Sequence, residues 1–476
     1  SGYGIARELS ERGRHRFMRF TTLAGASRPA LWPRASTAAL RASQPTAVLS
    51  PELATLLADG GGFSSTADEL AGSLFGASLF PWLAMLYWLK HPTVAAPSGV
   101  SFGLTFLLAF VFGSIPAAIG AGTLYGVSLA DSDLFHGAAE SLLAVTNCVV
   151  VLGFRDALEK GTVPGTASDC DSSARLRTAA TALGALSVLS AITVLASGSA
   201  EVHTPWLGGV GNLPISLWPA EPANALSVPT WIIHTSSLVE WLVAMGLAWR
   251  YADVVDQPEW KGVTWGMLPL HTSGIVACTY HLFYNDPAIT WCVALQAGTT
   301  CLGNTTLAYA CLRLALACGW TWQMGKEEAT AWLATLSADI AKLVGGEEAA
   351  RSEGSRAPST ATDASASSLS SEGAAQAAAS TATDASLVGW EDLGDAWATD
   401  SDGFFLAKLA ALSAGLAYVV KYSPAAFPPF LTEAWSSLPD EVISAIALTV
   451  ILVPTALNVA KWKQRSKEDA EFVGDF

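Results

Sequence analysis

The sequence predicts an all-α, polytopic transmembrane helix bundle of about nine spans, and three observations predict it. Apolar residues make up 51% of the 476 residues and charged residues only 14%, whereas soluble domains carry about 25% charge. The mean hydropathy is positive. The apolar residues occur in blocks of about 20, which at roughly 1.5 Å per residue are long enough to cross a lipid bilayer. This composition excludes a disordered, fibrous or ordinary soluble protein.

The first 50 residues differ from the rest of the chain. They contain eight Arg and two Glu, and no acidic residue occurs from Gly13 to Pro51. Basic, acid-poor segments rich in Ser, Thr and Ala are typical of organelle transit peptides. A disordered basic tail has the same composition and is the alternative. We therefore expect a transit-peptide-like segment at 1–50.

Nine apolar runs bounded by Gly, Pro and charged residues are the expected spans. They cover about 72–90, 99–120, 136–154, 177–197, 229–250, 263–283, 289–312, 404–420 and 441–460. The first seven would form a body made of a four-span region (68–200) and a three-span region (223–320). The last two would form a C-terminal hairpin (404–463).

The basic residues support this count. With nine spans, 17 of the 18 Lys and Arg residues after residue 50 fall on one side of the membrane, and only Lys421 falls on the other. Because Lys and Arg gather on the non-translocated side, the pattern predicts an odd number of spans. It also places the C-terminus inside and the mature N-terminus across the membrane.

Two segments separate the seventh and eighth spans. Residues 326–345 place Trp332, Leu333, Leu336, Ile340 and Leu343 on one helical stripe opposite charged residues. This pattern predicts an amphipathic helix, lying either on the membrane surface or on the protein's own inner face. Residues 346–386 consist mostly of Ala, Ser, Thr and Gly, which indicates a disordered low-complexity linker.

Histidines within the spans are candidate cofactor ligands, because ionisable groups in a membrane are costly. His234 begins the fifth span and His281 ends the sixth, so antiparallel helices should place both at similar depth, toward the same end as His136. Such imidazoles could hold a haem iron, a divalent metal or, singly, the magnesium of chlorophyll. Hydrogen bonding within the bundle is the simpler alternative. No Cys or His spacing indicates a dedicated metal site.

Three further residues are candidates for a proton or ion path. Glu240 in the fifth span and His271 in the sixth both lie near mid-membrane, and pairing them would avoid an isolated charge. Glu140 follows His136 by one helical turn and could pair with it. Interhelical hydrogen bonds are expected from Asn147, Gln296 and Asn304.

Signatures of catalysis are absent from the sequence. It contains no phosphate-binding loop, no H-E-x-x-H helix and no G-x-S-x-G elbow. Seven Cys without a C-x-x-C pair give neither a disulfide framework nor a zinc site. No basic patch with interleaved aromatics suggests nucleic acid. We expect a protein that is not an enzyme.

Two stretches carry a family resemblance. LSVPTWIIHTSSLVEWLVAMGLAWRYADV and WKGVTWGMLPLHTSGIVACTYHLFYN, within about 223–318, resemble the hypothetical chloroplast reading frame forty-nine family of small three-span membrane proteins. SLFPWLAMLYWL and the segment from IPAAIGAGTLYG to VLGFRDAL, within about 68–160, are similar to a second uncharacterised cyanobacterial and plant membrane family. Neither family supplies a reaction or a catalytic residue.

The resemblance implies a plastid membrane, with the thylakoid favoured and the inner envelope left open as the alternative, and a stromal C-terminus with a lumenal mature N-terminus. It implies a protein that associates with, assembles or stabilises a photosynthetic complex, with the lipid bilayer and subunits of a photosystem or other thylakoid complex as partners. The alternatives are a proton-coupled transporter using Glu240 and His271, or a haem- or chlorophyll-binding protein using His234 and His281.

Overall fold

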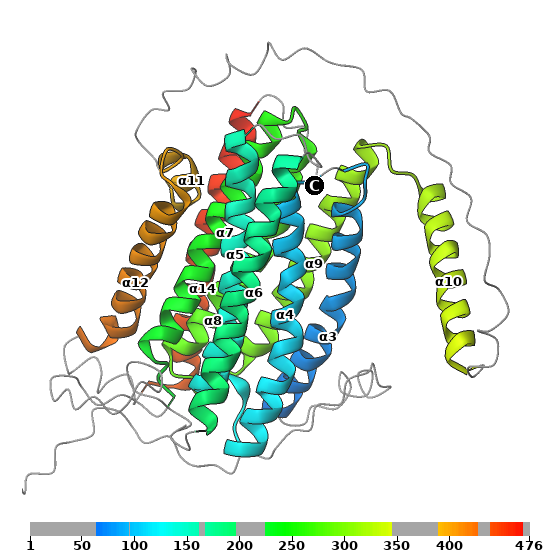
Figure 1. Ribbon diagram of the computed structural model, residues 1–476. Coiled ribbons are helices and arrows are strands. Elements are labelled where there is room, and N and C mark those ends of the chain that lie inside the picture. Colours follow the sequence, from blue (N-terminus) through cyan, green and yellow to red (C-terminus); the bar gives the residue numbers. More distant parts are fainter. Residues whose placement is uncertain are drawn as a thin grey trace, which may run out of the picture.

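The computed structural model describes residues 63–94, 96–160, 167–196, 224–344, 389–426 and 438–469, and these residues form an all-helical bundle without strands (Figure 1). The segments expected to be a transit peptide (1–50) and a linker (346–386) lie outside the described residues. A long helix occurs at every expected span. These helices are α3 (Phe63–Leu89), α4 (Ser98–Gly120), α5 (Asp133–Lys160), α6 (Ala167–Ala196), α7 (Val228–Val254), α8 (Glu259–Leu282), α9 (Trp291–Ala317), α12 (Asp402–Ala426) and α14 (Asp440–Glu468).

The all-α membrane bundle is thus confirmed, with a smaller number of clear spans than the nine expected. Seven of the described helices are long and apolar enough to cross a membrane, and α9 together with α10 (Trp322–Val344) raises the number to eight. Helix α8 is not among them, because Glu259, Lys261, His271 and His281 make it more polar. It nevertheless packs against both α7 and α9 inside the bundle.

Charge separates the two ends of the bundle. We call the end at which α3, α5, α7 and α9 finish the basic end, which is uppermost in Figure 1. Lys90, Arg155, Arg250 and Arg313 lie there. Lys421 lies at the opposite end, where it is buried and its ammonium donates to the carbonyl of Leu226. This lone exception to the charge pattern therefore has a structural role.

Close helix contacts hold the seven-helix body together. Helices α4 and α5 meet at Gly99 and Gly153, where a Cβ built on Gly153 would lie 2.6 Å from the backbone nitrogen of Val100. The expected interhelical bonds of two amides are confirmed. Asn147 Nδ2 donates to the carbonyl of Ser237 at 3.3 Å, and Asn304 Nδ2 donates to the carbonyl of Ser78 at 2.9 Å.

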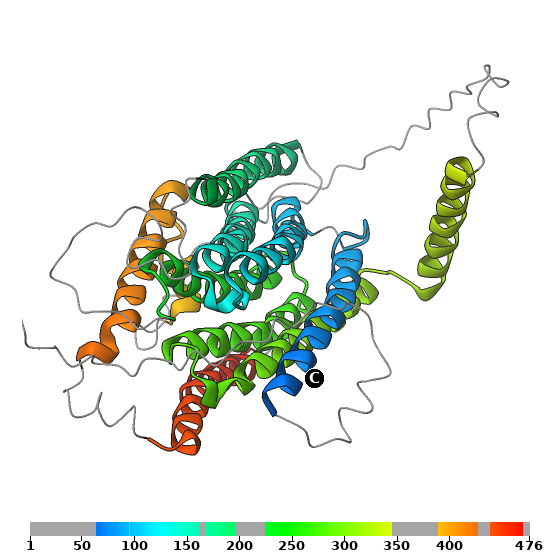
Figure 2. The same cartoon turned by 90° about the horizontal axis from the view of Figure 1, so that it is seen from below.

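The two C-terminal helices do not pack on each other as a hairpin. Helix α12 packs against α7, and α14 packs against α8 and the short helix η3 (Pro287–Ile289). Seen from below, they lie on different sides of the body (Figure 2). Thr235 of α7 donates to the carbonyl of Ser413 in α12 at 3.0 Å, and Trp265 of α8 donates to Ser466 of α14 at 3.0 Å. Helix α12 therefore packs on α7 and helix α14 on α8, so that each C-terminal helix contacts one member of the α7–α8 pair.

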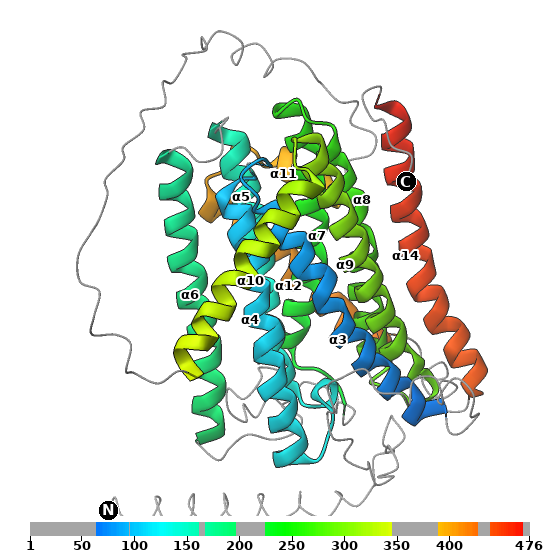
Figure 3. The same cartoon turned by 90° about the vertical axis from the view of Figure 1, so that its right-hand side faces the viewer.

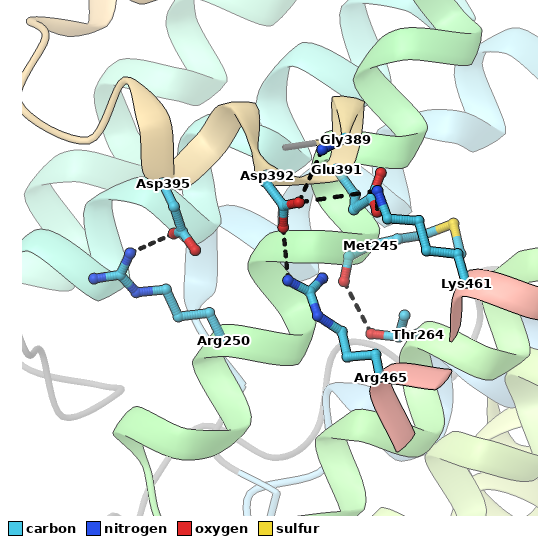
Figure 4. Close-up of polar contacts among 9 residues, drawn as sticks. All are labelled: Met245, Arg250, Thr264, Gly389, Glu391, Asp392, Asp395, Lys461 and Arg465. Carbon is cyan, nitrogen blue, oxygen red and sulfur yellow. Dashed lines mark hydrogen bonds and ion pairs between the residues drawn. The ribbon is translucent and has the colours of Figure 1, made fainter. Parts of the chain in front are cut away.

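A short segment at the basic end precedes α12. This docking segment, residues 389–401, contains η6 (Trp390–Asp392) and α11 (Leu393–Ala396). It sits against Gly246 of α7, where any Cβ would meet the carbonyl oxygen of Glu391. Its ion pairs with α7 and α14 are Glu391 with Lys461, Asp392 with Arg465 at 2.6 Å, and Asp395 with Arg250 (Figure 4).

Helix α10 is the expected amphipathic helix. It begins just after α9 and bends from it by 110°. Figures 1 and 2 show it standing apart from the rest of the bundle, and in the view from the right-hand side it crosses in front of the bundle (Figure 3). Its first turns are tied to the end of α3, because Glu328 accepts hydrogen bonds from Tyr87 and from His91 at 2.9 Å. Trp332 and Leu333 are exposed, at 62% and 57% of their surface.

Arg155 of α5 is expected to hold the docking segment in place. Its guanidinium is buried and donates to the carbonyls of Trp397 at 3.1 Å and Asp400 at 2.8 Å, and it lies over the Phe405 ring. Arg155→Lys keeps the charge but loses the forked geometry. Loss of one hydrogen bond from a charged donor costs about 1.5–3 kcal/mol, so the docking segment should open at least about tenfold more often.

Limited chymotrypsin digestion of the detergent-solubilised chain measures this opening, because Trp397 lies in the segment. We expect Arg155→Lys to speed cleavage about tenfold. Arg175→Lys, a change at an exposed basic residue of α6, is the matched control and should leave the rate unchanged. Equal rates for Arg155→Lys and the wild-type chain would show that the fork does not hold the segment.

Candidate functional site: a buried three-histidine cluster

Three helices bring three histidines together at the end of the bundle opposite the basic end. His136 lies in the first turn of α5, His234 in the second turn of α7 and His281 in the last turn of α8. Since α7 and α8 run antiparallel, the start of one adjoins the end of the other. All three side chains are buried, with exposed fractions of 8%, 6% and 3%. We call them the histidine cluster.

The three imidazoles are in mutual contact. The Nε2 atoms of His136 and His234 are 2.8 Å apart, which is a hydrogen bond if one ring donates. The ring of His281 lies 4.8 Å from that of His136 and 5.0 Å from that of His234, centroid to centroid. One nitrogen from each ring lies within 4.8 Å of the others. The cluster therefore presents three imidazole nitrogens to one small volume.

An outer layer of polar groups orients His281. Its Nδ1 lies 2.9 Å from Oδ1 of Asn285, and Nδ2 of Asn285 donates to Oδ1 of Asp131 at 2.7 Å. If Asn285 Oδ1 accepts the proton on Nδ1, then Nε2 of His281 carries the free lone pair. Asn285 has φ of 56°, in the left-handed region that Asn tolerates better than most residues. The turn after α8 thus serves to place this amide.

The contact between α5 and α7 fixes His136 beside His234. Gly137 allows the close approach, because a Cβ there would lie 2.6 Å from Oγ1 of Thr230. Asp133 Oδ1 accepts the backbone N–H of Ser227 at 2.8 Å, and the Ser227 hydroxyl caps the start of α7. These contacts tie the first turns of both helices together, so the positions of the two rings are set by backbone anchors.

The pair formed by His136 and His234 suits a bare ion better than a haem held between the two rings. Two imidazoles on opposite faces of a haem would hold their nitrogens about 4 Å apart, since each metal–nitrogen bond is about 2.0 Å. The nitrogens of His136 and His234 are 2.8 Å apart, and the third ring packs edge-on against His136. The alternative raised by the sequence, a haem or chlorophyll held by His234 and His281, involves a different pair and stays a prediction.

The residues proposed for a proton path do not come together. Glu240 is buried but interacts with α5, where the Cys148 thiol donates to its Oε1 at 3.2 Å. His271 instead lies against α14, with Nδ1 3.3 Å from the Asn458 amide. The expected Glu240–His271 pair is therefore wrong, since depth in the membrane matches but the helix faces do not. Glu140 lies one turn from His136 toward the basic end, while the hydrogen bond of His136 goes to His234.

Sequence reasoning placed all three histidines at one end and named all three as candidate ligands, but it predicted a facing pair only for His234 and His281. It also missed Asn285 and Asp131. The signal for Asn285 was its spacing of four residues after His281, which puts both on one helical face. Nothing in the sequence marks Asp131, because its contact comes from a loop of a distant segment.

The comparisons with known proteins divide the chain into two regions. Residues 225–313 match a family described as a protein of unknown function, DUF2499, and residues 71–159 match another, DUF3593. His234 and His281 lie in the first region and His136 in the second, so the histidine cluster is assembled from both. No solved structure matches the chain.

Two similar proteins share the DUF2499 region. A Ycf49-like protein of Synechocystis is 48% identical over 87 residues, which are 18% of this chain and 84% of that protein. The uncharacterized protein ycf49 of Cyanophora paradoxa is 30% identical over 89 residues, which are 19% of this chain and 87% of that protein. The chain therefore belongs to the Ycf49-like (DUF2499) family and carries a DUF3593 region in the same polypeptide.

Proposed function

We propose that this chain is a non-enzymatic plastid membrane protein, of the thylakoid, that associates with, assembles or stabilises a photosynthetic complex. Its similar proteins come from a cyanobacterium and from Cyanophora paradoxa, which supports a plastid setting. In that setting the basic end of the bundle faces the stroma, because basic loops stay on the non-translocated side.

The observation that carries this proposal is how the DUF2499 region is buried. In α7, 67% of the apolar stretch is buried, compared with 17% in α4 and α6. Much of that cover comes from outside the region, since α5 and α12 both pack on α7. A three-helix module whose first helix is covered by helices from outside the module is built to associate with other membrane segments, by close packing and interhelical hydrogen bonds.

The short length of the similar proteins also supports association with other membrane segments. This chain covers 84% and 87% of their lengths with the DUF2499 region alone. Those short proteins therefore have little sequence left from which to build the helices that correspond to α5 and α12. A face that this chain covers internally would be covered there by another chain. Association between membrane proteins is the property that this geometry supports best.

The projecting helix α10 offers a contact surface beside the bundle, running down from the basic end (Figure 1). Near its start it is fixed to the end of α3 through Glu328, and the described side chains beyond that point include the exposed Trp332 and Leu333. An exposed aromatic and aliphatic pair is a common anchor for a protein partner. This surface would reach past the edge of the bundle to a neighbouring complex.

Native gel electrophoresis of mildly solubilised thylakoids tests the proposal. We expect the full-length tagged chain to migrate in a band much larger than its own 49.6 kDa and to co-purify with photosynthetic subunits. Trp332→Ala with Leu333→Ala should shift it to lower mass. Lys463→Met, at an exposed residue of α14, should not. A chain that runs alone in several mild detergents, or that fractionates with the envelope, would contradict the proposal.

A further inference from the structure

We propose that His136, His234 and His281 bind one divalent first-row transition-metal ion, such as Zn²⁺, through three imidazole nitrogens. Neutral imidazole is a preferred ligand for Zn, Cu, Fe and Ni, and three histidines with one open position form a known type of zinc site. The three nitrogens already lie within 4.8 Å of one another, on side chains that are at least nine-tenths buried. The site goes beyond the proposed association with a complex and does not depend on it.

Metal binding requires the three rings to adjust, because ligand nitrogens that now lie up to 4.8 Å apart must close by as much as about 1.5 Å. Zinc–imidazole bonds of about 2.0 Å at tetrahedral angles separate two ligand nitrogens by about 3.3 Å. The His136–His234 distance of 2.8 Å would have to open by roughly half an ångström on binding, which small side-chain rotations supply. Without an ion the same two rings share a hydrogen bond, so the cluster has a sensible metal-free form.

The outer layer is of the kind that metal sites use. A metal-bound histidine normally donates its other ring N–H to a carboxylate, carbonyl or water, which fixes the tautomer. His281 has such a partner in Asn285, which is itself held by the carboxylate of Asp131 at 2.7 Å. This chain of contacts turns Nε2 of His281 toward the other two rings and leaves it free to coordinate.

Charge at this end of the bundle also favours a cation. Asp131 and Asp133 lie within electrostatic range of His136. A divalent ion held by three neutral rings brings two positive charges into a buried place, and nearby carboxylates lower that cost. The ligands lie within two turns of their helix ends, at the end of the bundle opposite the basic end.

Metal binding by the purified full-length chain tests the site. We would strip the detergent-solubilised protein with chelator, load it with Co²⁺ as a spectroscopic substitute for Zn²⁺, desalt it and measure bound metal by mass spectrometry. The expected result is about one Co²⁺ per chain, with the visible absorption of a four-coordinate ion. The variant carrying His136→Ala, His234→Ala and His281→Ala should retain close to none.

Two single variants refine the test. Asn285→Ala removes the outer-layer partner and should weaken Co²⁺ binding by about 10- to 100-fold. His271→Ala is the matched control, because His271 is equally buried in α8 but lies outside the histidine cluster. It should bind Co²⁺ as the wild-type chain does. Equal metal in the triple variant and the wild type, or a loss in His271→Ala as large as in the triple variant, would overturn the proposal.

A measurement on the wild-type chain alone covers the case in which the triple variant does not fold. An ion that binds only the folded state raises the unfolding temperature as its concentration rises above the dissociation constant. We expect Zn²⁺ to raise that temperature, and chelator to reverse the rise. A wild-type chain that takes up neither Co²⁺ nor Zn²⁺, with no change in unfolding temperature, would show that the cluster is only a hydrogen-bonded group.

Discussion

Replacing Gly153 with alanine is expected to destabilise the bundle, although alanine is the better helix former. A Cβ at this position would lie 2.6 Å from the backbone nitrogen of Val100 and 2.7 Å from the carbonyl carbon of Gly99. Both are backbone atoms of α4 and cannot rotate away, so α4 and α5 must separate. Overpacking of this kind costs about 1–3 kcal/mol, which exceeds the gain of about 1 kcal/mol in helix propensity.

The matched control is Gly76→Ala in α3. Nothing lies within 4 Å of a Cβ built at Gly76, so only the gain in helix propensity remains. Thermal unfolding in detergent, followed by the fraction that stays monodisperse, should therefore show opposite signs for the two variants. Gly153→Ala should unfold at a lower temperature than the wild type, and Gly76→Ala at the same or a higher temperature. If Gly153→Ala is as stable as the control, α4 and α5 do not pack this closely.

The fold could be predicted because a bilayer makes hydropathy informative. Each apolar run became a long helix, and the depth argument correctly set His234 level with His281. Hydropathy also explains why α8, expected as a span, is not among the clear spans. Polar residues such as Lys261 can be accommodated in a helix whose neighbours surround it, and Lys261 pairs with Asp253 at 2.6 Å and with Asp469 at 2.5 Å.

What depth does not encode is the direction in which a side chain points around its helix. Glu240 follows His234 by six positions, which at 3.6 residues per turn is a rotation of about 240°. If His234 faces the histidine cluster, Glu240 must face elsewhere, and it contacts Cys148 of α5.

The grouping of His136 with the other two rings could not have been deduced. It depends on which helices are neighbours, and apolar residues on all sides of a buried helix give no such signal. The histidine cluster joins residues of α5, α7 and α8. His136 and His234 lie 98 positions apart in the sequence. Packing of the DUF3593 region on the DUF2499 region creates it.

Lys461→Met is expected to release the docking segment from the body. Glu391 is only 5% exposed and pairs with the Lys461 ammonium, which also lies 3.9 Å from Asp392 (Figure 4). Removing the lysine leaves a buried carboxylate without its partner, and such losses cost roughly 3 kcal/mol. Because Lys461 is itself 38% exposed, water can partly replace it, and the lower end of the range applies.

A second substitution, Glu391→Gln, distinguishes the loss of the Glu391–Lys461 attraction from the cost of burying an unpaired Glu391 carboxylate. Glu391→Gln keeps the shape of the side chain but removes its charge, so the double variant with Lys461→Met no longer buries an unpaired carboxylate. We expect it to recover most of the stability lost in Lys461→Met, and Lys463→Met, at an exposed neighbour in α14, to behave as the wild type. Chymotrypsin cleavage of the docking segment and the unfolding temperature report both effects. Additive losses in the double variant would mean that the two residues act independently, and the docking segment would then be held by Arg155 and by Asp392 with Arg465.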